Sequence, residues 1–536
     1  MMSKSSNQTA DVVVAGAGHN SLITAAYLAK AGYSVIVLDA RPIPGGGAST
    51  EEPLLPGYKI DTCSTGHTLI RVNPVLTKDE LGLQSKYGLK YLEPDPVAHV
   101  RFPDGEYLTH WLDVDRTCEE IAHFSKHDAL AYRRMLGEYE EVKGAYAAAR
   151  NTPPGMGPSL QELLLRTPHG SKWVRIEAMS SWDVIRHEFE DRHIQAYMLW
   201  QAFMTVQAVD APGSGSLAYS IIYSRQQRSW SIPQGGSGKL TDGLVALLEE
   251  HGARIVCNQK VAKLVLEHGR CAGVETEDGE RYLGTKAVVS TIHVKHLIDM
   301  APHDAWPEDF HFGVETYDIG ITSMAAYIAA KEAPAFTTRE GTQTAVSAGM
   351  VGWPENMVSI GRQIKDGKFI LGVPWLLVAT PTLADSSRAP DGHHTVKLLS
   401  PQTWQLPADD DWNVIKEMQV DYQLDQLRKH APNFTDDKII ARLVKAPDDF
   451  ERSNPHMIHG AFHGGDRGLS QSGALRPVPG WAQYRMPIPG LYQTGGTTHP
   501  GGSITGAPGR NAAMVILQDL GTSLEQVLQK TAAGVR

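Results

Sequence analysis

A strand, a glycine turn, a helix, a second strand and an acid follow one another near the start of the chain. Residues 11–15 (DVVVA) predict a buried strand, and GAGHNS follows directly at residues 16–21. A helical pattern comes next, and residues 33–38 predict a second strand that ends on Asp39. This order is typical of a βαβ unit that binds a dinucleotide, in which the acid follows the first glycine by about 20 residues.

Each residue of this unit has a physical role. Gly16 permits a tight turn, and Gly18 lets the backbone approach a pyrophosphate. The N-terminus of the following helix offers free N–H groups and partial positive charge to that anion. Asp39 would accept hydrogen bonds from an adenosine ribose. Ser21 replaces the third glycine of the motif and is small enough for close packing of helix on strand.

A second glycine cluster follows the acid. Arg41 precedes Pro-Ile-Pro and then Gly45, Gly46 and Gly47. A Rossmann domain for a nicotinamide cofactor alone does not need this second loop, whereas a large FAD site uses one to close on the phosphates. The sequence therefore favours FAD, and a nicotinamide-only dehydrogenase is the weakest alternative.

Composition and charge exclude several classes of protein. The chain has 536 residues, of which 42% are hydrophobic, and its formal net charge is −10. This length suggests two or three domains, or one large domain with an insertion, and the apolar fraction suffices for a sizeable core. An acidic balance without long charged runs argues against a nucleic-acid partner. Four cysteines without a CxxC pair argue against a redox dithiol.

No stretch of the sequence predicts an obligatory membrane segment. The first residues lack the apolar run of a signal peptide. Residues 12–29 contain the glycine turn, and residues 369–384 are interrupted by Pro374 and Pro381. We expect a reducing, cytoplasmic location, with membrane contact possible for a lipid-soluble substrate.

Three separated segments resemble one family. They contain GAGHNS and ARPIPGGGAST in the first 75 residues, IPQGGSGKL within residues 230–300, and LRPVPG with QTGGTTHPGGSITGAPGR within residues 475–520. All three resemble the FAD-binding blocks of phytoene-desaturase-like oxidoreductases. The most similar branch includes the pyridine nucleotide-disulphide oxidoreductase domain-containing protein 2.

The resemblance implies an α/β fold with a discontinuous, Rossmann-like FAD-binding domain. Residues 1–75, 230–300 and 475–536 would form that domain. Residues 76–229 and 301–474 would form an α+β substrate domain.

The resemblance also implies which residues approach FAD. The backbone of Val261 would contact the adenine side, and Gly502–Ile504 would lie against the isoalloxazine. A helix N-terminus there would stabilise the negative charge of the reduced flavin. The expected cofactor-binding residues are Gly16, Gly18, Asp39, Arg41, Gly45, Gly46, Val261, Gly496, Thr497, Gly502, Ser503 and Ile504.

One position departs from the pattern of many large flavoproteins. They carry an acidic residue where this chain has Gly496, and its carboxylate contacts FAD. Gly496 and Thr497 would still approach the ribityl chain and the pyrophosphate, but the carboxylate contact is missing here.

Two histidines are candidate catalytic residues. His499 lies inside the C-terminal flavin block, where it would donate a proton or polarise a substrate. His67 follows the second glycine loop and would line the substrate cavity. The alternative for both is a hydrogen-bonded packing role, and His19 in the phosphate turn is expected to be structural. No GxSxG or HExxH motif suggests other chemistry.

A further group of histidines lies in the sequence NPHMIHGAFHGGD. The spacing of His456, His459 and His463 suggests a metal site, but Pro455 and Gly460 disfavour a helix there. We expect a loop near the flavin and no metal.

Large apolar residues are candidates for an apolar substrate tunnel. They equally suit an ordinary core, which is the more frequent role of such a pattern. These residues are Trp182, Trp200, Trp230, Met179, Met198 and Met204.

The favoured function is an FAD-dependent desaturase or dehydrogenase that forms a C=C bond in an apolar or cyclic substrate. Hydride transfer to flavin N5 and loss of a proton from the adjacent carbon would complete the reaction. A flavin oxidase of amines or alcohols is the first alternative. A flavin-dependent isomerase or a scaffold without net redox turnover is the second. The electron acceptor is left open between oxygen, a quinone and another protein.

Overall fold

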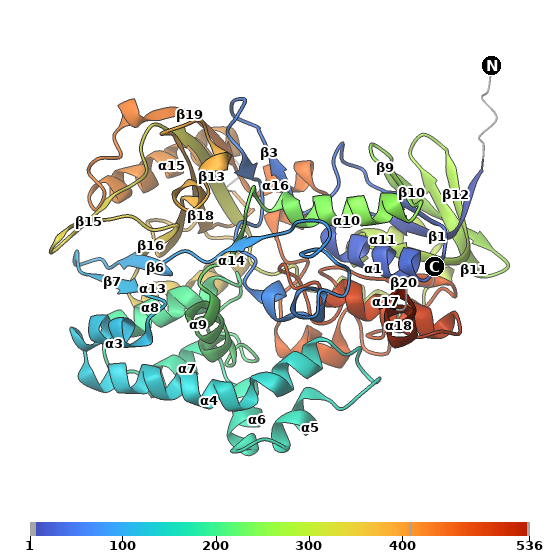
Figure 1. Cartoon of the computed structure of the whole chain (residues 1–536), viewed down its shortest axis with the longest axis horizontal. Coiled ribbons are helices and arrows are strands. Elements are labelled where there is room, and N and C mark those ends of the chain that lie inside the picture. The colour runs from blue at the N-terminus through green and yellow to red at the C-terminus, as the bar shows by residue number, and fades with distance from the viewer. Residues whose placement is uncertain (1–6, 407–409, 533–536) are drawn as a thin grey trace.

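The computed structural model describes residues 7–406 and 410–532. The described strands form two seven-stranded sheets, one on the right of Figure 1 and one on the left, and three two-stranded sheets. Further short elements lie between the main ones along the chain. These elements are β3 (Thr50–Glu51), β4 (Ile60–Asp61), α2 (Pro74–Thr77), β5 (Tyr91–Leu92), β8 (Ile232–Pro233), α11 (Val294–Leu297), α12 (Glu308–Glu315), β14 (Phe336–Thr338), β15 (Gly341–Gln343), α13 (Pro354–Val358), α14 (Ile360–Lys365) and α16 (Pro447–Ser453).

The first sheet contains the predicted βαβ unit. Its path runs β10-β11-β12-β1-β2-β9, and β20 pairs with β12. The central strand β1 pairs in parallel with both β2 and β12, and such strands read as continuous apolar runs because both faces are covered. The strands are β1 (Gln8–Ala15), β2 (Val35–Leu38), β9 (Arg254–Val256), β10 (Val261–Glu267), β11 (Arg270–Thr276), β12 (Arg281–Ser290) and β20 (Leu491–Gln493).

Three helices from distant parts of the chain pack together on this sheet. Helix α1 (His19–Lys30) lies against both α10 (Gly238–Glu250) and α17 (Ala507–Asp519), and α18 (Leu524–Ala532) follows. Helices α1 and α17 approach closely because a side chain at Gly509 would overlap the carbonyl of Asn20. The Thr24 hydroxyl donates a hydrogen bond of 2.9 Å to the Gly509 carbonyl across the same contact.

The second sheet has the strand order β19-β13-β18-β17-β16-β6-β7. Its pairs are antiparallel except for β16 with β6. Helix α15 (Trp412–Arg428) packs its apolar residues on one face. The strands are β6 (Ala98–Arg101), β7 (Tyr107–His110), β13 (Ser323–Ala330), β16 (Ser347–Val351), β17 (Trp375–Ala379), β18 (His394–Pro401) and β19 (Ile439–Lys445).

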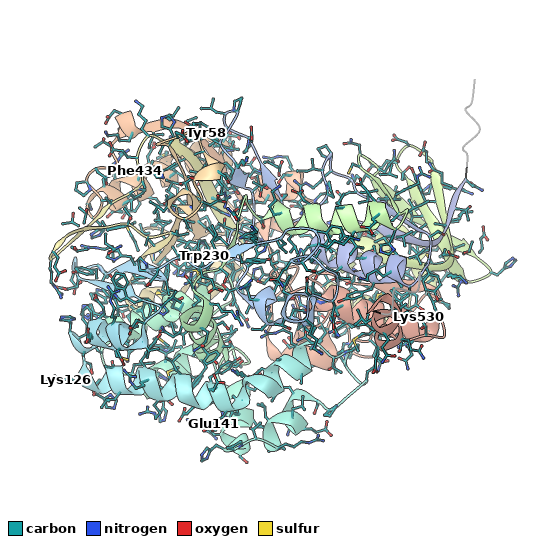
Figure 2. The ribbon with its side chains drawn as sticks, viewed as in Figure 1. Tyr58, Lys126, Glu141, Trp230, Phe434 and Lys530 are labelled. Carbon is teal, nitrogen blue, oxygen red and sulfur yellow. The ribbon has the colours of Figure 1, made fainter. Side chains whose placement is uncertain are left out.

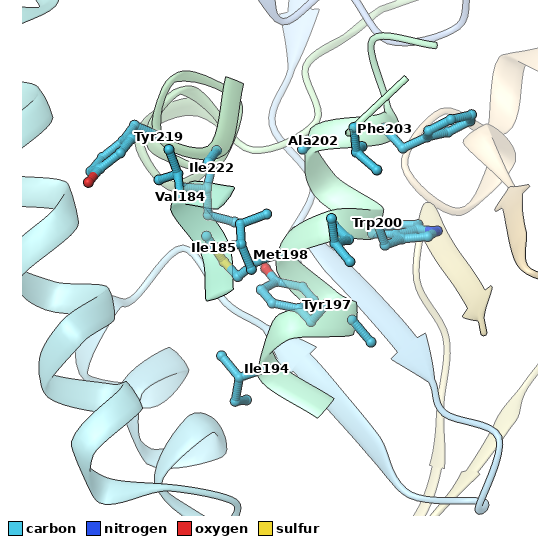
Figure 3. Close-up of a cluster of buried hydrophobic side chains, with 14 of the residues drawn as sticks. Val184, Ile185, Ile194, Tyr197, Met198, Trp200, Ala202, Phe203, Tyr219 and Ile222 are labelled. Carbon is cyan, nitrogen blue, oxygen red and sulfur yellow. The ribbon is translucent and has the colours of Figure 1, made fainter. Parts of the chain in front are cut away.

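A layer of helices covers the other face of the second sheet. Helix α8 packs against both α7 and α9, which also contact each other, and Figure 3 shows their apolar side chains gathered on one side of α8. The Trp200 indole donates to the Leu376 carbonyl, and the Trp375 indole donates to the Trp200 carbonyl, so α8 is fixed on β17. The helices are α3 (Val114–Ala122), α4 (Lys126–Arg150), α5 (Leu160–Leu165), α6 (Gly170–Ala178), α7 (Ser181–Glu188), α8 (Arg192–Phe203) and α9 (Leu217–Arg228).

The strands of the two sheets come from different stretches of the chain. Strands of the first sheet all lie within residues 1–75, 230–300 and 475–536, and those of the second within residues 76–229 and 301–474. We keep the division into two domains with these boundaries as a proposal. In the part of the chain that the structure describes, no helix is both long and apolar enough to cross a bilayer.

Candidate cofactor and active site

A cavity of about 620 Å³ lies between the two sheets. On one side it meets the carboxyl ends of β1, β2 and β12, and on the other it meets β17 and β18. Ligands of open α/β sheets bind at such carboxyl ends, and the volume falls in the range of small-molecule sites. Figure 2 shows Trp230, one of the lining residues, near the middle of the molecule.

Most of the predicted cofactor-binding residues meet at this cavity, although they are distant in sequence. Gly45 and Thr497 do not line it. The lining residues among those predicted are Gly16, Gly18, Asp39, Arg41, Gly46, Val261, Gly496, Gly502, Ser503 and Ile504.

The first glycine turn leaves the N-terminus of α1 open toward the cavity. Gly18 is the N-cap, no side chain caps the helix, and its first turn has no acidic residue. Gly16 has φ +101°, and a side chain there would overlap Thr291 Oγ1. The Ser21 hydroxyl donates to the carbonyls of Gly16 and Gly18, at 2.5 and 2.9 Å. Free N–H groups and the helix dipole therefore face a space suited to a pyrophosphate.

The second glycine loop packs directly on the first. The Gly45 N–H donates to the Ala17 carbonyl at 2.7 Å. Gly45 therefore joins the two loops although it does not itself line the cavity. A Cβ at Gly46 would lie 3.2 Å from the Gly18 Cα. Arg41 fixes the loop by donating to the Gly46 carbonyl at 3.0 Å and to Glu51 at 2.9 Å.

Asp39 holds the ends of both loops. Its carboxylate accepts hydrogen bonds from the N–H groups of Ala17 and Arg41, at 2.7 and 2.8 Å. Burial raises the pKa of Asp39, against the opposing effect of these two hydrogen bonds. The neighbouring wall contains Gln259 and Val261, and we keep this end of the cavity as the proposed site of the adenosine half.

The C-terminal block forms the opposite wall. A Cβ at Gly496 would lie 2.8 Å from the His463 carbonyl oxygen, and one at Gly502 would overlap it. Arg476 donates to the Gly496 carbonyl at 2.6 Å, and Arg467 donates to the Gly502 carbonyl. Thr497 is buried behind this wall, where its hydroxyl accepts from Gln493 at 3.3 Å.

The two candidate catalytic histidines lie outside the cavity lining. His67 is fully buried, with Nε2 at 2.6 Å from the Ser237 hydroxyl and Nδ1 at 3.1 Å from the Tyr91 hydroxyl. His499 Nε2 lies 3.0 Å from the Ala149 carbonyl oxygen. These contacts fit the packing alternative, and a catalytic role for either residue stays a prediction.

Five other histidines line the cavity, and burial lowers the pKa of four of them, namely His19, His293, His456 and His463. Burial lowers the pKa of His19 and of His456 to about 4 and that of His463 to about 3. Burial also lowers the pKa of His293 well below its usual value. All four rings are therefore neutral near pH 7. His19 was expected to be structural, and no sequence motif singled out His293.

The histidine-rich loop runs along the cavity as expected. His456 and His463 line it, whereas His459 stacks on Trp404 with ring centroids 3.8 Å apart. The three side chains do not converge on one point. Their spacing in the sequence reflects an irregular loop with a left-handed residue at His459, where φ is +50°.

The end of the cavity near the second sheet is mostly apolar. Met204 and Trp230 belong to it, as the tunnel hypothesis predicts. Met198 and Trp200 instead lie in the core between α8 and its neighbours, and Met179 and Trp182 pack against that core. Further lining residues here are Val206, Trp375, Leu377, Leu399, Met457 and Phe462.

Lys397 brings a cationic side chain to this apolar end. Its Nζ donates to the Cys63 carbonyl, and burial lowers its pKa. Cys63 also lines the cavity, and burial raises the pKa of its thiol.

These residues fit FAD on structural grounds. A side chain at Gly16 would overlap Thr291, whereas a Cβ at Gly18 would stand in open space beside the cavity, where a dinucleotide would approach the backbone. Buried polar atoms without a partner in the described chain lie beside the same turns, namely His19 Nε2, Asn20 Oδ1 and His293 Nε2. Buried polar groups require hydrogen-bond partners, which the polar middle of FAD offers.

A dinucleotide cradle that opens into an apolar chamber defines a flavin-dependent oxidoreductase. The model of the family "Flavin containing amine oxidoreductase" matches residues 22–313, more than half of the chain. The protein therefore belongs to this family, and its cofactor is FAD.

Known proteins resemble the chain over nearly its whole length. Pyridine nucleotide-disulfide oxidoreductase domain-containing protein 2 of Mus musculus is 29% identical, covering 95% of this chain and 94% of that protein. A limonene dehydrogenase chain of Castellaniella defragrans is 26% identical, covering 96% and 95%. The lycopene-forming phytoene desaturase of Pantoea ananas is also 26% identical, covering 95% and 99%. The predicted resemblance and the enzyme class are confirmed.

Solved structures of the same type share the fold. Cyclohexylamine oxidase from Brevibacterium oxydans aligns with a TM-score of 0.59 at 15% identity, covering 95% of this chain and 99% of that one. The predicted α/β fold with a Rossmann-like FAD-binding unit is confirmed.

Proposed function

We propose that this enzyme is a desaturase or dehydrogenase that forms a C=C bond in an uncharged apolar or cyclic substrate. One observation carries the proposal: the distribution of charge along the cavity. The lining carboxylates are Asp39, Glu277 and Asp299, and all three lie toward the adenosine end. Among the described lining residues, the apolar end offers the cation Lys397 and no carboxylate. It therefore suits a neutral hydrocarbon better than an ammonium ion.

FAD, when bound, supplies the two-electron acceptor that takes a hydride. The protein's own contribution is to exclude water and to orient the substrate. Trp230, Trp375 and Phe462 surround the substrate end with aromatic surface. Placing a C–H bond in reacting geometry supplies a large part of the rate in such reactions.

A panel of substrates tests this proposal directly. The full enzyme is mixed anaerobically with terpenes and polyenes, cyclic ketones and primary amines, and bleaching of the flavin absorbance is followed. We expect bleaching by a member of the first two groups. Bleaching by amines alone would contradict the proposal and favour amine oxidation. Admitting oxygen or a quinone to the reduced enzyme then identifies the electron acceptor.

Amine oxidation is the second candidate function. The family description and the likeness to cyclohexylamine oxidase favour it. It requires a neutral amine, since none of the described residues at the substrate end is a carboxylate that could hold the protonated form. Activity would then rise as the pH approaches the pKa of the amine.

Catalytic roles for His67 and His499 stay part of the proposal. They require that H67N and H499N slow flavin reduction by substrate while the flavin content stays unchanged. A loss of flavin or of stability in these variants would assign both residues to packing, as their hydrogen bonds suggest.

A further inference from the structure

His456 reaches into the cavity from the loop that follows α16. Its Nδ1 lies 2.9 Å from the carbonyl oxygen of Thr291, the residue after β12. A carbonyl oxygen only accepts hydrogen bonds, so Nδ1 must carry the proton. The neutral ring then presents Nε2 as an unprotonated acceptor. Because burial holds its pKa at about 4, this form prevails at neutral pH.

The acceptor lies beside Gly496. A Cβ built on Gly496 would be 3.1 Å from His456 Nε2, and one on Gly464 would be 2.7 Å from it. The edge of the imidazole thus occupies the space that a side chain at position 496 would fill. A loop from the second-sheet half of the molecule supplies the polar group that the C-terminal block lacks.

Nε2 lies along the middle of the cavity. Gly16, Thr291 and Gly495 line the same stretch, between the adenosine end at Val261 and the apolar end at Trp230. The middle of FAD consists of a pyrophosphate, which only accepts hydrogen bonds, and a ribityl chain with hydroxyl donors. An acceptor nitrogen repels phosphate oxygens and pairs with a hydroxyl.

We propose that His456 accepts a hydrogen bond from a ribityl hydroxyl of FAD. Thr291 positions the ring by fixing its tautomer, as a second hydrogen bond does for histidine ligands in general. The adjacent His293 has the opposite polarity. Its Nδ1 accepts from the Lys295 N–H at 3.2 Å, so its Nε2 carries a proton and is a donor. The two rings are 5.4 Å apart and give this wall one acceptor and one donor.

Two substitutions test the two ring nitrogens of His456 separately. H456N keeps a donor near Nδ1 for the Thr291 carbonyl and removes the distant acceptor. H456Q keeps an acceptor near the position of Nε2. H459N is the matched control, because His459 is in the same loop but outside the cavity, and Asn tolerates its left-handed backbone.

Dissociation constants of FAD and ADP are measured with the full chain after removal of its flavin. One neutral hydrogen bond corresponds to about a three- to tenfold change in affinity. We expect H456N to bind FAD weaker by this factor with ADP binding unchanged, H456Q to recover part of the loss, and H459N to match the wild type. Wild-type FAD affinity in H456N, or an equal loss for ADP, would overturn the proposal.

FAD analogues that each lack one ribityl hydroxyl give a test that needs no comparison of folding between variants. One analogue should bind the wild type about three- to tenfold weaker than FAD. That penalty should disappear in H456N. If every analogue carries the same penalty in both proteins, His456 does not accept from the ribityl chain. Because no substrate takes part, these results are independent of the desaturase proposal.

Discussion

Two guanidinium groups lie behind the glycine block at the flavin end of the cavity. Arg476 donates to the carbonyls of Gly496 and Asp466, and Arg467 donates to that of Gly502. These contacts use neutral carbonyl oxygens, so the positive charges are not cancelled by them. Burial and the charge of Arg476 lower the pKa of Arg467 to about 9, which leaves it cationic at neutral pH. The resulting positive potential favours the anionic reduced flavin.

The R467Q variant tests this potential. Glutamine can still donate to the Gly502 carbonyl but carries no charge. We expect the midpoint potential of the bound flavin to fall by tens of millivolts, since a nearby unit charge contributes on the order of 1 kcal/mol. Spectroelectrochemical titration measures it, with R452Q on the exposed surface of α16 as the control. An unchanged potential in R467Q would remove Arg467 from this role.

Residues of the local motif were predictable from the sequence, whereas the histidine wall was not. Gly16, Gly18 and Asp39 belong to one βαβ unit, whose spacing alone brings them together. His293 and His456 meet only through tertiary packing, so no local pattern could have paired them. Two sequence signals pointed toward His456, namely the histidine-rich segment expected near the flavin and the carboxylate missing at Gly496, but neither paired it with His293.

At the scale of elements, an ion pair joins α17 to the turn after α2. Arg510 donates to Glu80 at 2.8 and 3.0 Å, and the Tyr27 hydroxyl donates to the same carboxylate at 2.6 Å. Burial alone would raise the pKa of Glu80, but the hydrogen bonds and the charge of Arg510 outweigh it and lower that pKa. A carboxyl whose pKa is lowered on folding adds stability above its unfolded pKa.

The E80Q variant should therefore show a pH-dependent loss of stability. Near pH 7 we expect a loss of about 2 kcal/mol, because Arg510 remains buried without its charged partner. Wild-type Glu80 contributes fully above its unfolded pKa of about 4.5, and the contribution is lost as pH falls through the lowered folded pKa. Urea unfolding at pH 7 and at pH 3 measures the difference, which should shrink at the lower pH. A difference that does not change with pH would contradict the assignment.

The close approach of α1 and α17 gives a second prediction. In G509A the new methyl group would overlap the Asn20 carbonyl, forcing the helices apart. We expect a loss of about 1–3 kcal/mol and weaker FAD binding, since α1 presents the pyrophosphate site. The control is G137A in α4, where a Cβ meets no atom within 4 Å. Its helix should gain about 0.5–1 kcal/mol. Equal effects of the two changes on thermal unfolding would refute this account.

The ends of several helices and strands could not be predicted from local sequence patterns. The predicted strand at residues 11–15 extends back to Gln8, because β12 continues to pair with β1 there through an irregular register. The helix expected after the C-terminal glycine block begins at Ala507, with Pro508 in its first turn. Strands such as β6 and β16 pair across about half the chain, so their partners follow from packing and not from local patterns.

For the whole molecule, the position of the cavity predicts that FAD stabilises both halves together. The residues that line it come from both sheets. At a free concentration of 100 times its Kd, a ligand adds about 2.7 kcal/mol to the free energy of unfolding. We expect the unfolding temperature to rise when FAD is added to the flavin-free protein. ADP is added at the same multiple of its own Kd as a control. Because ADP fills only the adenosine end, the half of the molecule that contains the second sheet should remain sensitive to trypsin. Equal protection by both ligands would show that the flavin half adds nothing to the second sheet.

The first sheet combines strands that are far apart in the sequence, and this affects how the protein folds during synthesis. Helix α1 is translated long before its neighbour α17 and the strand β20. Until they leave the ribosome, one side of α1 has no packing partner, and the part of the cavity wall that the C-terminal block forms has not yet been made. Until then a nascent chain exposes the apolar face of α1 that α17 covers, and we expect FAD to bind only after α17 and β20 have been made.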